Sequence, residues 1–402
     1  MSVTGIIIYP IKAMQGIPLP SSRLRASKLH YDRSFCVVDS VGIRYPKNTA
    51  LSMRQLPKLA SIEVHIDLND HIILQNPENP EDFVKFPITL NQEEGPPEIL
   101  VECAGASTTS SAEDGAWHLG HVKCREQMKN VSEWLSEILN DIDSSHKAKK
   151  KERTVYKLMR CVDDHSESRL VSNWAGPSSK PFSADVSKQR NNDASPFKFS
   201  HLKVNTSDRI TFQDAFPVNI LNMASFRSLQ ADLRERFADN PEMLKKVNDY
   251  NPISFRPNII IDGFRPYEEE DFGDFTIGML PFRGLKGCPR CTVPAMGSEG
   301  EWVFSAKGEQ LAYQKVLRKR FPKKCIDDEW GKAWQGVIFT MHCAYRGEEN
   351  QFIHVGDAVA VHTRLGSWFN SKQIEKIANK YGFLAVGWVI AVFYLASAMT
   401  KM

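Results

Sequence analysis

The sequence predicts a mixed α/β protein that is mostly β, with two globular domains followed by a hydrophobic C-terminal segment. Three observations predict this fold class. Short apolar segments separated by turn residues fill the first hundred residues, most of the other strand-like segments follow residue 250, and only two stretches have clear helical periodicity. With 402 residues, 42% of them apolar, the chain is long enough for two or three domains with cores of their own.

The first hundred residues are predicted to be all-β, as a barrel or a sandwich. Pro, Gly, Asn and Asp separate the strand-like segments, which read GIIIYPI, SFCVVDS, LASIEVHIDL, DHIILQ and FVKFPITL. A helix is predicted over 127–142, because apolar side chains recur there at helical spacing. These side chains are Val131, Trp134, Leu135, Ile138, Leu139 and Ile142. We expect this helix to cover one face of the β structure.

A dense basic run at 146–154 marks the expected end of the first domain. Its sequence, HKAKKKERT, is typical of a solvated linker, and the alternative interpretation is a contact with an anionic surface. A strand is predicted over 154–162. The polar passage that follows, 163–208, has few apolar residues, and a loop of that length is either functional or disordered.

The second half is predicted to be mixed and again mostly β. A helix is expected over 225–237, with Ser225 as its N-cap. Its apolar face would consist of Phe226, Leu229, Leu233 and Phe237. Later strands are predicted from the segments FRPNIIID, FTIGMLPF, GVIFTMHCAY and VGDAVAVH.

Charge and cysteine usage limit the possible function classes. Lys and Arg number 51 against 48 Asp and Glu, and this near balance gives no reason to expect nucleic-acid binding. The N-terminus begins with a strand-like segment and has no secretory signal. The eight cysteines are mostly scattered, several of them in apolar segments, so we expect reduced structural thiols in a reducing compartment.

The segment 381–399 is predicted to be a transmembrane tail anchor. Its sequence, YGFLAVGWVIAVFYLASAM, contains no charged residue, and its length just spans a hydrocarbon core of about 30 Å. Lys372, Lys376 and Lys380 precede it within the basic juxtamembrane segment 364–380, and this side of the membrane is therefore expected to be cytosolic. The mitochondrial outer membrane is the favoured location, with the endoplasmic reticulum or the peroxisome as alternatives.

The pair Cys288 and Cys291, in the sequence LKGCPRCTVPAMG, raises three alternatives. A structural zinc site needs four ligands, and no second Cys or His pair with suitable spacing is present. A thioredoxin-like dithiol needs a helix directly after the pair, but Pro294 and Gly297 disfavour one there. The third alternative is a site in which one thiolate holds a metal and the other cysteine only supports it.

Three basic residues in separate turns form a candidate anion-binding set. Lys12 follows the first strand, Arg33 lies in YDRSF, and Arg256 comes directly before a proline. Each of them alone is more often a surface charge or a structural ion pair. The sequence has none of the common dinucleotide, P-loop, zinc-protease or serine-hydrolase motifs.

An ordered set of segments resembles the eukaryotic amidoxime-reducing component family, whose members are molybdenum-cofactor enzymes. The segments are YPIKAMQGIPL, YDRSFCVVD, SMRQLPKLASIEV, DAFPVNILNMASF, SFRPNIIIDG and LKGCPRCTVP. The resemblance covers about residues 4–363. It implies a MOSC N-terminal β-barrel domain at 1–150 and a β-barrel-like MOSC domain at 155–363.

The resemblance also implies the site residues. The molybdenum ligand of the family corresponds to Cys291, which would complete the metal's coordination beside the two sulfurs of a molybdopterin dithiolene. The pterin and its phosphate would be held by Lys12, Ala13, Arg33, Asp214, Ala215, Phe216, Arg256, Pro289 and Arg290. Many relatives have hydroxyl residues where this chain has Ala13, Ala215, Phe216 and Pro289, so a contact made by such a hydroxyl is lost here.

The implied activity is the reduction of amidoximes, hydroxylamines and other N-oxygenated compounds. The chain has no flavin, haem or iron–sulfur motif, and electrons would come from a b-type haem cytochrome fed by an NADH-dependent flavin reductase. The rival function is a MOSC carrier that holds the cofactor, or sulfur bound to its cysteine, for delivery to other enzymes. The chain shows no pyridoxal-phosphate desulfurase domain, which argues against a complete sulfurase.

Overall fold

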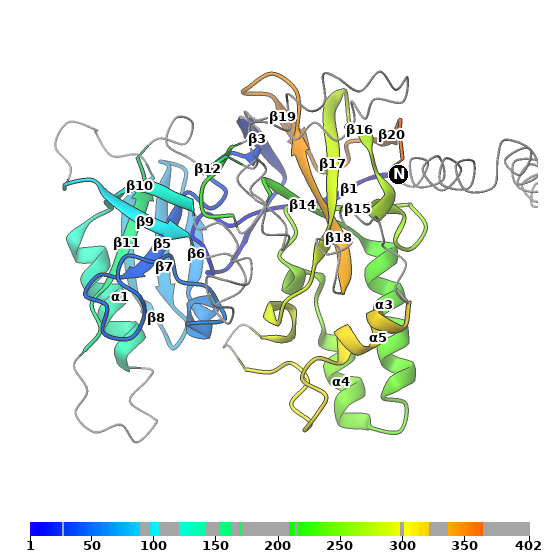
Figure 1. Cartoon of the computed structure of the whole chain (residues 1–402), viewed down its shortest axis with the longest axis horizontal. Coiled ribbons are helices and arrows are strands. Elements are labelled where there is room, and N and C mark those ends of the chain that lie inside the picture. Colours follow the sequence, from blue (N-terminus) through cyan, green and yellow to red (C-terminus); the bar gives the residue numbers. More distant parts are fainter. Residues whose placement is uncertain are drawn as a thin grey trace, which may run out of the picture.

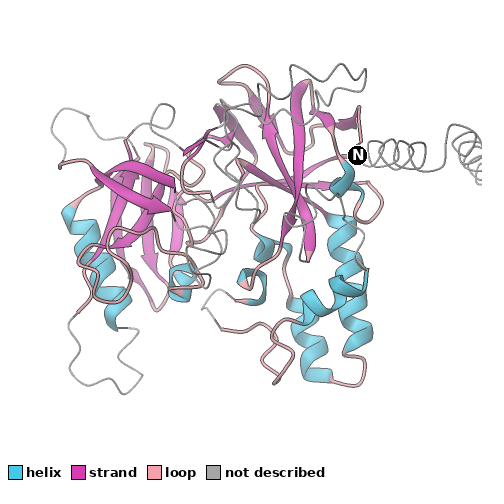
Figure 2. Ribbon diagram, viewed as in Figure 1, coloured by secondary structure: helices cyan, strands magenta, loops and turns pink. Residues whose placement is uncertain are grey.

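The structure is a computed structural model that shows two lobes side by side (Figure 1). It describes residues 1–25, 28–88, 96–103, 120–141, 153–162, 169–170, 209–213, 216–297, 301–320 and 337–364. Most of the described elements are strands, and the longer helices of the second lobe gather at one end of it (Figure 2). The mixed, mostly β fold class is therefore confirmed.

The first lobe contains a four-stranded sheet, a three-stranded sheet and a helix. The four-stranded sheet has the order β5-β11-β10-β9, and the three-stranded sheet has the order β6-β7-β8. The bounds are β5 Phe35–Asp39, β6 Glu63–Ile66, β7 His71–Asn76, β8 Asn79–Pro87, β9 Ile99–Cys103, β10 Gly120–Glu126, β11 Tyr156–Cys161 and α1 Lys129–Asp141. A short 3-10 helix, η1 (Pro57–Ser61), occupies part of the segment predicted as a strand at LASIEVHIDL.

Helix α1 packs its predicted apolar stripe against this β structure. Val131, Leu135 and Leu139 are buried in one core with Phe35 and Phe86. The alternation of strand side chains places Phe35 and Val37 of β5 in this core. The intervening residues, Cys36 and Val38, lie on the opposite face of the sheet in a second core with Cys103, Cys124 and Cys161. Four cysteines that are scattered in the sequence are therefore buried together.

The second lobe is built around an eight-stranded sheet with the order β2-β1-β15-β14-β18-β17-β16-β20. The bounds are β1 Ser2–Ile8, β2 Ile17–Leu19, β14 Val218–Asn222, β15 Ile259–Asp262, β16 Asp274–Ile277, β17 Leu280–Pro289, β18 Ile338–Tyr345 and β20 Val359–Val361. A three-stranded sheet has the order β19-β3-β4, with β19 Phe352–His354, β3 Ser21–Arg25 and β4 Lys28–Leu29. A two-stranded sheet pairs β12 Arg169–Leu170 with β13 Arg209–Ile210.

Helices cover one face of the eight-stranded sheet. They are α3 Met223–Arg236, α4 Pro241–Asp249 and α5 Ala312–Arg320, with the 3-10 helices η5 Pro252–Phe255, η6 Glu268–Asp271 and η7 Val293–Ala295. Along β1, Ile7 points into the core beneath these helices. Its neighbours Ile6 and Ile8 point into the core on the other face. The sheet is therefore buried on both sides.

The strand pairing crosses the expected domain boundary at residue 150. Strands β1 and β2 belong to the sheet of the second lobe, where β1 pairs with β15. Conversely, β11 lies after residue 150 but pairs with β5 and β10 of the first lobe. The chain therefore exchanges segments between the two lobes, and residues 30–34 connect β4 of the second lobe to β5 of the first.

The predicted N-cap of the second helix is wrong. Helix α3 begins after Asn222, whose side-chain oxygen accepts a hydrogen bond from the backbone N–H of Ala224 at 3.1 Å. Ser225 is instead buried, and its hydroxyl donates to Glu269 Oε2 at 2.7 Å. The cap lies three residues earlier because β14 runs directly into the helix.

Two predictions concern residues that the structure does not describe. Residues 171–208 of the polar passage and the predicted anchor at 381–399 lie outside the described part of the chain. Among the helices that are described, none is both long and apolar enough to cross a membrane.

Candidate functional site

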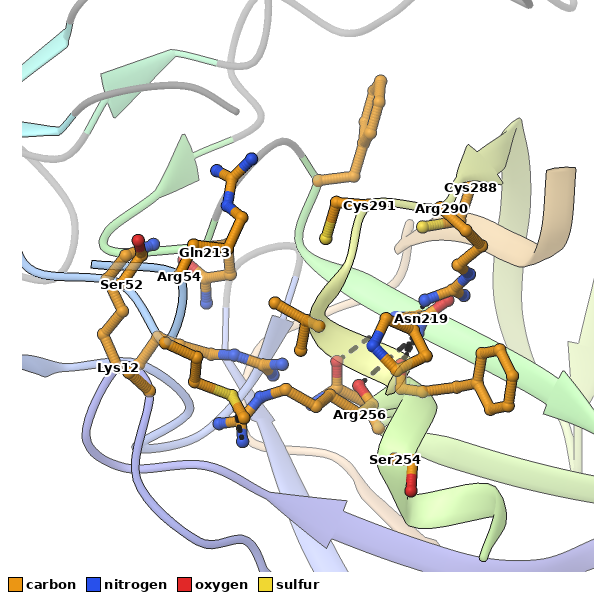
Figure 3. A pocket seen from close by; sticks show the side chains of 18 of the residues that line it. Lys12, Ser52, Arg54, Gln213, Asn219, Ser254, Arg256, Cys288, Arg290 and Cys291 are labelled. Atoms are coloured by element: carbon orange, nitrogen blue, oxygen red, sulfur yellow. Dashed lines mark hydrogen bonds between the residues drawn. The ribbon is translucent and has the colours of Figure 1, made fainter. Parts of the chain in front are cut away.

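A pocket brings residues of both lobes together, over sequence distances of up to 330 positions. Of the predicted site residues, those that line it are Lys12, Ala13, Arg33, Phe216, Arg256, Arg290 and Cys291. Asp214 and Ala215 lie outside the described residues, and only the backbone of Pro289 is described. Figure 3 shows the pocket from close by. The structure thus gathers the three separate cations and the cysteine pair into one site.

The two cysteines of the CPRC sequence differ in exposure. Cys288 lies near the end of β17 and is 8% exposed. Cys291 lies in the turn after this strand and is partly exposed, whereas the other described cysteines are buried. In Figure 3 the sulfur of Cys291 points into the pocket. A three-residue 3-10 helix follows, so the pair does not start the longer helix that a thioredoxin-like dithiol needs.

Two side chains of α5 hold the turn that carries Cys291. The hydroxyl of Tyr313 donates to the carbonyl of Cys291, and Nε2 of Gln314 donates to the same carbonyl at 3.0 Å. Gln314 Nε2 also lies 3.0 Å from the carbonyl oxygen of Arg290. Burial raises the pKa of Tyr313, so the phenol keeps the proton that it donates. The backbone on either side of the thiol is therefore fixed by a buried helix.

Arg290 is tied to the protein by its own guanidinium. Nε donates to the carbonyl of Phe339 at 2.7 Å, Nη1 donates to that of Phe255 at 3.1 Å, and Nη2 donates to the hydroxyl of Thr340. This arginine thus holds the turn of the cysteine pair against β18 and η5. It keeps a place in the pocket lining, but most of its contacts are structural.

Arg33 forms an ion pair with Asp32, which is fully buried. Nη1 of Arg33 lies 2.6 Å from both carboxylate oxygens. Asp32 also accepts from the backbone N–H of Tyr9 at 2.9 Å, Asn258 Nδ2 at 3.0 Å and Gln213 Nε2 at 3.3 Å. Asp32 therefore joins four segments of the chain and orients the guanidinium of Arg33 at the pocket.

The other two predicted cations are held by backbone carbonyls. Lys12 is 8% exposed, and its Nζ donates to the carbonyl of Phe212 at 3.0 Å. Arg256 Nη2 donates to the carbonyl of Met14 at 2.8 Å. Together with Arg33, these side chains bring three basic groups to one pocket.

Several site residues have an unusual backbone conformation. Ala13, Arg33 and Arg256 have φ angles of 72°, 50° and 51°, in the left-handed region that residues other than glycine rarely adopt. Each such residue costs on the order of 1 kcal/mol or more and persists only when its surroundings stabilise it. This concentration of strained residues at one pocket is typical of a functional site.

Sequence reasoning missed part of the pocket wall. Asn219 and His342 are register partners on β14 and β18, and both line the pocket. The His342 ring lies 5.0 Å from the ring of Phe216. Ser52 and Arg54 also line the pocket. They lie in SMRQLPKLASIEV, a segment that resembles the family as a whole but does not mark these two residues as part of a site. Tyr313 and Gln314 lie on α5, which had not been predicted, so no sequence signal pointed to them.

The donor set fits a molybdopterin-type cofactor. Cations suit a phosphate, with which they form charge-assisted hydrogen bonds. One accessible thiol suits a soft metal that takes its other ligands from the cofactor. Among the described residues, no three His, Cys, Asp or Glu side chains form a cluster that could hold a metal ion.

Two family models match the chain. The MOSC N-terminal beta barrel domain matches residues 1–141, and the MOSC domain matches residues 207–360. Together they cover most of the chain.

Two groups of named relatives are similar to the chain. Molybdenum cofactor sulfurase of Homo sapiens is 25% identical over 358 residues, which are 89% of this chain but 32% of the sulfurase. Mitochondrial amidoxime-reducing component 1 of Mus musculus is 23% identical over 364 residues, 89% of this chain and 81% of the relative. Mitochondrial amidoxime reducing component 2 of Bos taurus is 36% identical over 83 residues, 21% of each chain.

The chain spans about a third of the length of the sulfurases it matches. This chain belongs to the MOSC-domain proteins related to the molybdenum cofactor, with a MOSC N-terminal beta barrel domain followed by a MOSC domain.

Proposed function

We propose that the protein is a molybdenum-cofactor oxidoreductase that reduces N-hydroxylated compounds such as amidoximes and hydroxylamines. The observation that carries the proposal is that the partly exposed thiol of Cys291 shares one pocket with Lys12, Arg33 and Arg256. The pocket therefore combines a soft thiolate, which can bind a metal, with cations, which can bind a phosphate. The match spans 81% of an amidoxime-reducing component but only 32% of a sulfurase, and this full-length similarity supports the proposal.

Each residue has a specific task in this proposal. Lys12, Arg33 and Arg256 bind the terminal phosphate of the cofactor, and Asp32 keeps Arg33 oriented toward it. Cys291 supplies the single protein ligand of the metal. The hydrogen bonds from Tyr313 and Gln314 to its carbonyl limit the movement of the thiolate.

When bound, the cofactor supplies a metal centre that accepts an oxygen atom and transfers two electrons. The net reaction converts an N–OH group to N–H and consumes two electrons and two protons, with water as the second product. The residues around the thiol shape the space for the substrate. Phe216 and His342 form one side of this space, with their ring centres 5.0 Å apart.

The electron source of the proposed enzyme is a b-type haem cytochrome fed by an NADH-dependent flavin reductase. The interface of such an electron-transfer complex is small, and the complex is transient. We also propose that segment 381–399 anchors the enzyme to the mitochondrial outer membrane, with the endoplasmic reticulum or the peroxisome as alternative locations. A shared membrane would raise the effective concentration of the partners.

A second candidate function is supported by the similarity to the sulfurases. The matched part is about a third of each sulfurase, so the chain would be a carrier that holds the cofactor, or sulfur bound to Cys291, for delivery to another enzyme. Purified protein given reduced methyl viologen and benzamidoxime distinguishes the two functions. A reductase turns over many times per molybdenum atom, whereas a carrier produces no benzamidine above a cofactor-free control.

A further inference from the structure

Two of the three predicted basic residues at the pocket, Arg33 and Arg256, lie over one aromatic ring. The guanidinium carbon of Arg33 is 4.4 Å from the centre of the Tyr9 ring, and that of Arg256 is 4.2 Å from the same centre. The two carbons are therefore less than about 9 Å apart, which is close enough for their charges to repel each other in a partly buried site. Asp32 offsets the charge of Arg33, and the Tyr9 ring is a second group that attracts this guanidinium together with that of Arg256.

Tyr9 is more completely buried than either arginine. It is 0% exposed and belongs to the core beneath α3, α4 and α5. Its backbone N–H donates to Asp32, so its position is linked to the ion pair of Arg33. A side chain at Gly16 would place a Cβ 2.5 Å from Cε1 of the Tyr9 ring, so this glycine leaves the space that the ring occupies.

The ring itself, and not the hydroxyl, makes the polar contact of Tyr9. Its hydroxyl is buried without a hydrogen-bond partner among the described residues. Burial raises the pKa of this phenol to about 12, although the nearby Arg256 and Arg33 act in the opposite direction. Tyr9 is therefore neutral at physiological pH, and it attracts the two cations through the negative face of its π system.

We propose that Tyr9 is a positioning residue whose ring holds Arg33 and Arg256 side by side, so that both can bind the same phosphate group in the pocket. The two arginines come from turns more than two hundred residues apart, and the Arg256 guanidinium also contacts the Met14 carbonyl and the sulfur of Met53. In the described part of the chain, the Tyr9 ring contacts both guanidinium groups. It compensates for their repulsion before the anion arrives, and the site is thereby preorganised. This inference rests on the proposed function for the identity of the anion, but not for the anion's charge.

The test separates the electrostatics of the ring from its shape. Tyr9→Phe and Tyr9→4-fluoro-, 3,5-difluoro- and 3,4,5-trifluorophenylalanine keep a ring of similar size, while each added fluorine weakens its negative face. Full-length protein without cofactor is titrated with inorganic pyrophosphate by calorimetry. We expect the affinity to fall stepwise with fluorination, by about three- to tenfold for the trifluoro variant relative to Tyr9→Phe.

A matched control distinguishes an effect of the Tyr9 ring on the arginines from a general effect of fluorination on the core. Phe304 lies in the same apolar core as Tyr9, with Phe237 and Tyr250 as ring neighbours, and carries no described cation contact. Phe304→3,4,5-trifluorophenylalanine should leave pyrophosphate affinity unchanged. An affinity that is independent of fluorination at position 9, or that falls equally with the Phe304 variant, would overturn the proposal.

The molybdenum content of the same variants, produced with cofactor synthesis, separates the two proposals. If the wild-type protein binds no molybdenum, but fluorination at position 9 lowers the affinity of the variants for pyrophosphate, the positioning role of Tyr9 stands and the proposed function fails. If molybdenum is bound and fluorination changes neither its content nor pyrophosphate affinity, the positioning role fails and the proposed function stands.

Discussion

Asp32 and Arg33 are neighbours in the chain, and their side chains form a buried ion pair in which Arg33 Nη1 lies 2.6 Å from Asp32 Oδ2. The backbone of Arg33 takes a left-handed conformation, with φ of 50°. The pair connects a cation of the pocket to a carboxylate that also accepts hydrogen bonds from Asn258 and Gln213.

Asp32→Asn should therefore destabilise the fold as well as the site. The change removes a buried negative charge and leaves its donors with a weaker acceptor, and hydrogen bonds to charged groups contribute roughly 1.5–3 kcal/mol each. We expect the free energy of unfolding in urea to fall by about 2–3 kcal/mol. Asp239→Asn, at an exposed position, is the matched control. Equal unfolding curves for the Asp32 variant and the wild type would contradict the structural role of the pair.

Replacing any of Lys12, Arg33 or Arg256 with Ala should lower cofactor content. Each side chain lines the pocket, and loss of one charge-assisted hydrogen bond corresponds to roughly ten- to hundredfold weaker binding. Arg256→Lys should rescue only in part, because an ammonium cannot reproduce a planar fork of donors. Molybdenum per protein is measured by mass spectrometry, with Lys129→Ala, at a side chain that is 87% exposed, as the control. Full molybdenum occupancy in all three alanine variants would exclude the shared anion.

Glu269 should make the stability of the second lobe fall as the pH rises from about 4.5 to 7. The side chain is 0% exposed, and burial raises its pKa from 4.5 to about 7, despite hydrogen bonds from Ser225 and Asn222. The folded state keeps the proton that the unfolded state releases above pH 4.5. The stabilisation is therefore complete below that pH and is lost as the pH rises through 7, by about 3 kcal/mol in total.

Glu269→Gln has no proton to release, so its stability should vary less between pH 5 and pH 8 than that of the wild type. Thermal unfolding over this range is the measurement. A wild-type midpoint that rises toward pH 8 would mean that the carboxyl is charged in the fold. The variant also keeps the oxygen that accepts from Ser225.

The tail prediction is tested by removing residues 381–402. If the segment is only an anchor, the shortened protein should be soluble and should keep its molybdenum and its activity with an artificial donor. Activity with membrane-bound electron partners should fall, because the shared surface no longer concentrates them. Each activity is compared with the full chain in detergent. Loss of the cofactor on truncation would show that the segment belongs to the fold.

The sequence predicted those parts of the structure that depend on local patterns. The strands β1, β5, β7 and β18 and the stripe of α1 follow from alternation and helical spacing, and both patterns are set by a few neighbouring residues. The short 3-10 helix over 57–61 was missed because its apolar residues fit a strand equally well. The cap at Ser225 was wrong because a nearer polar residue, Asn222, ends the preceding strand.

The sequence itself indicated the three basic residues and the cysteine pair, and the resemblance united them in one site. Arg33 and Arg256 followed from segments that fit the family, but their shared ring at Tyr9 did not, since no local pattern reports a contact over 247 positions. Tyr313 and Gln314 reach the Cys291 carbonyl from a helix that the sequence did not reveal. The gathering of Cys36, Cys103, Cys124 and Cys161 likewise depends on sheet order, which short-range patterns do not encode.

The central claim is that Cys291, and not Cys288, binds the molybdenum of the cofactor. X-ray absorption at the molybdenum edge of purified, loaded protein tests it most directly, because it counts sulfur neighbours of the metal independently of turnover. We predict one sulfur neighbour fewer in Cys291→Ser than in the wild type, together with loss of benzamidoxime reduction, since a hydroxyl is a poor substitute for thiolate at this metal. Cys288→Ser should keep the wild-type sulfur count and substantial activity. An unchanged sulfur count in Cys291→Ser, or an equal loss of sulfur in both variants, would contradict the account.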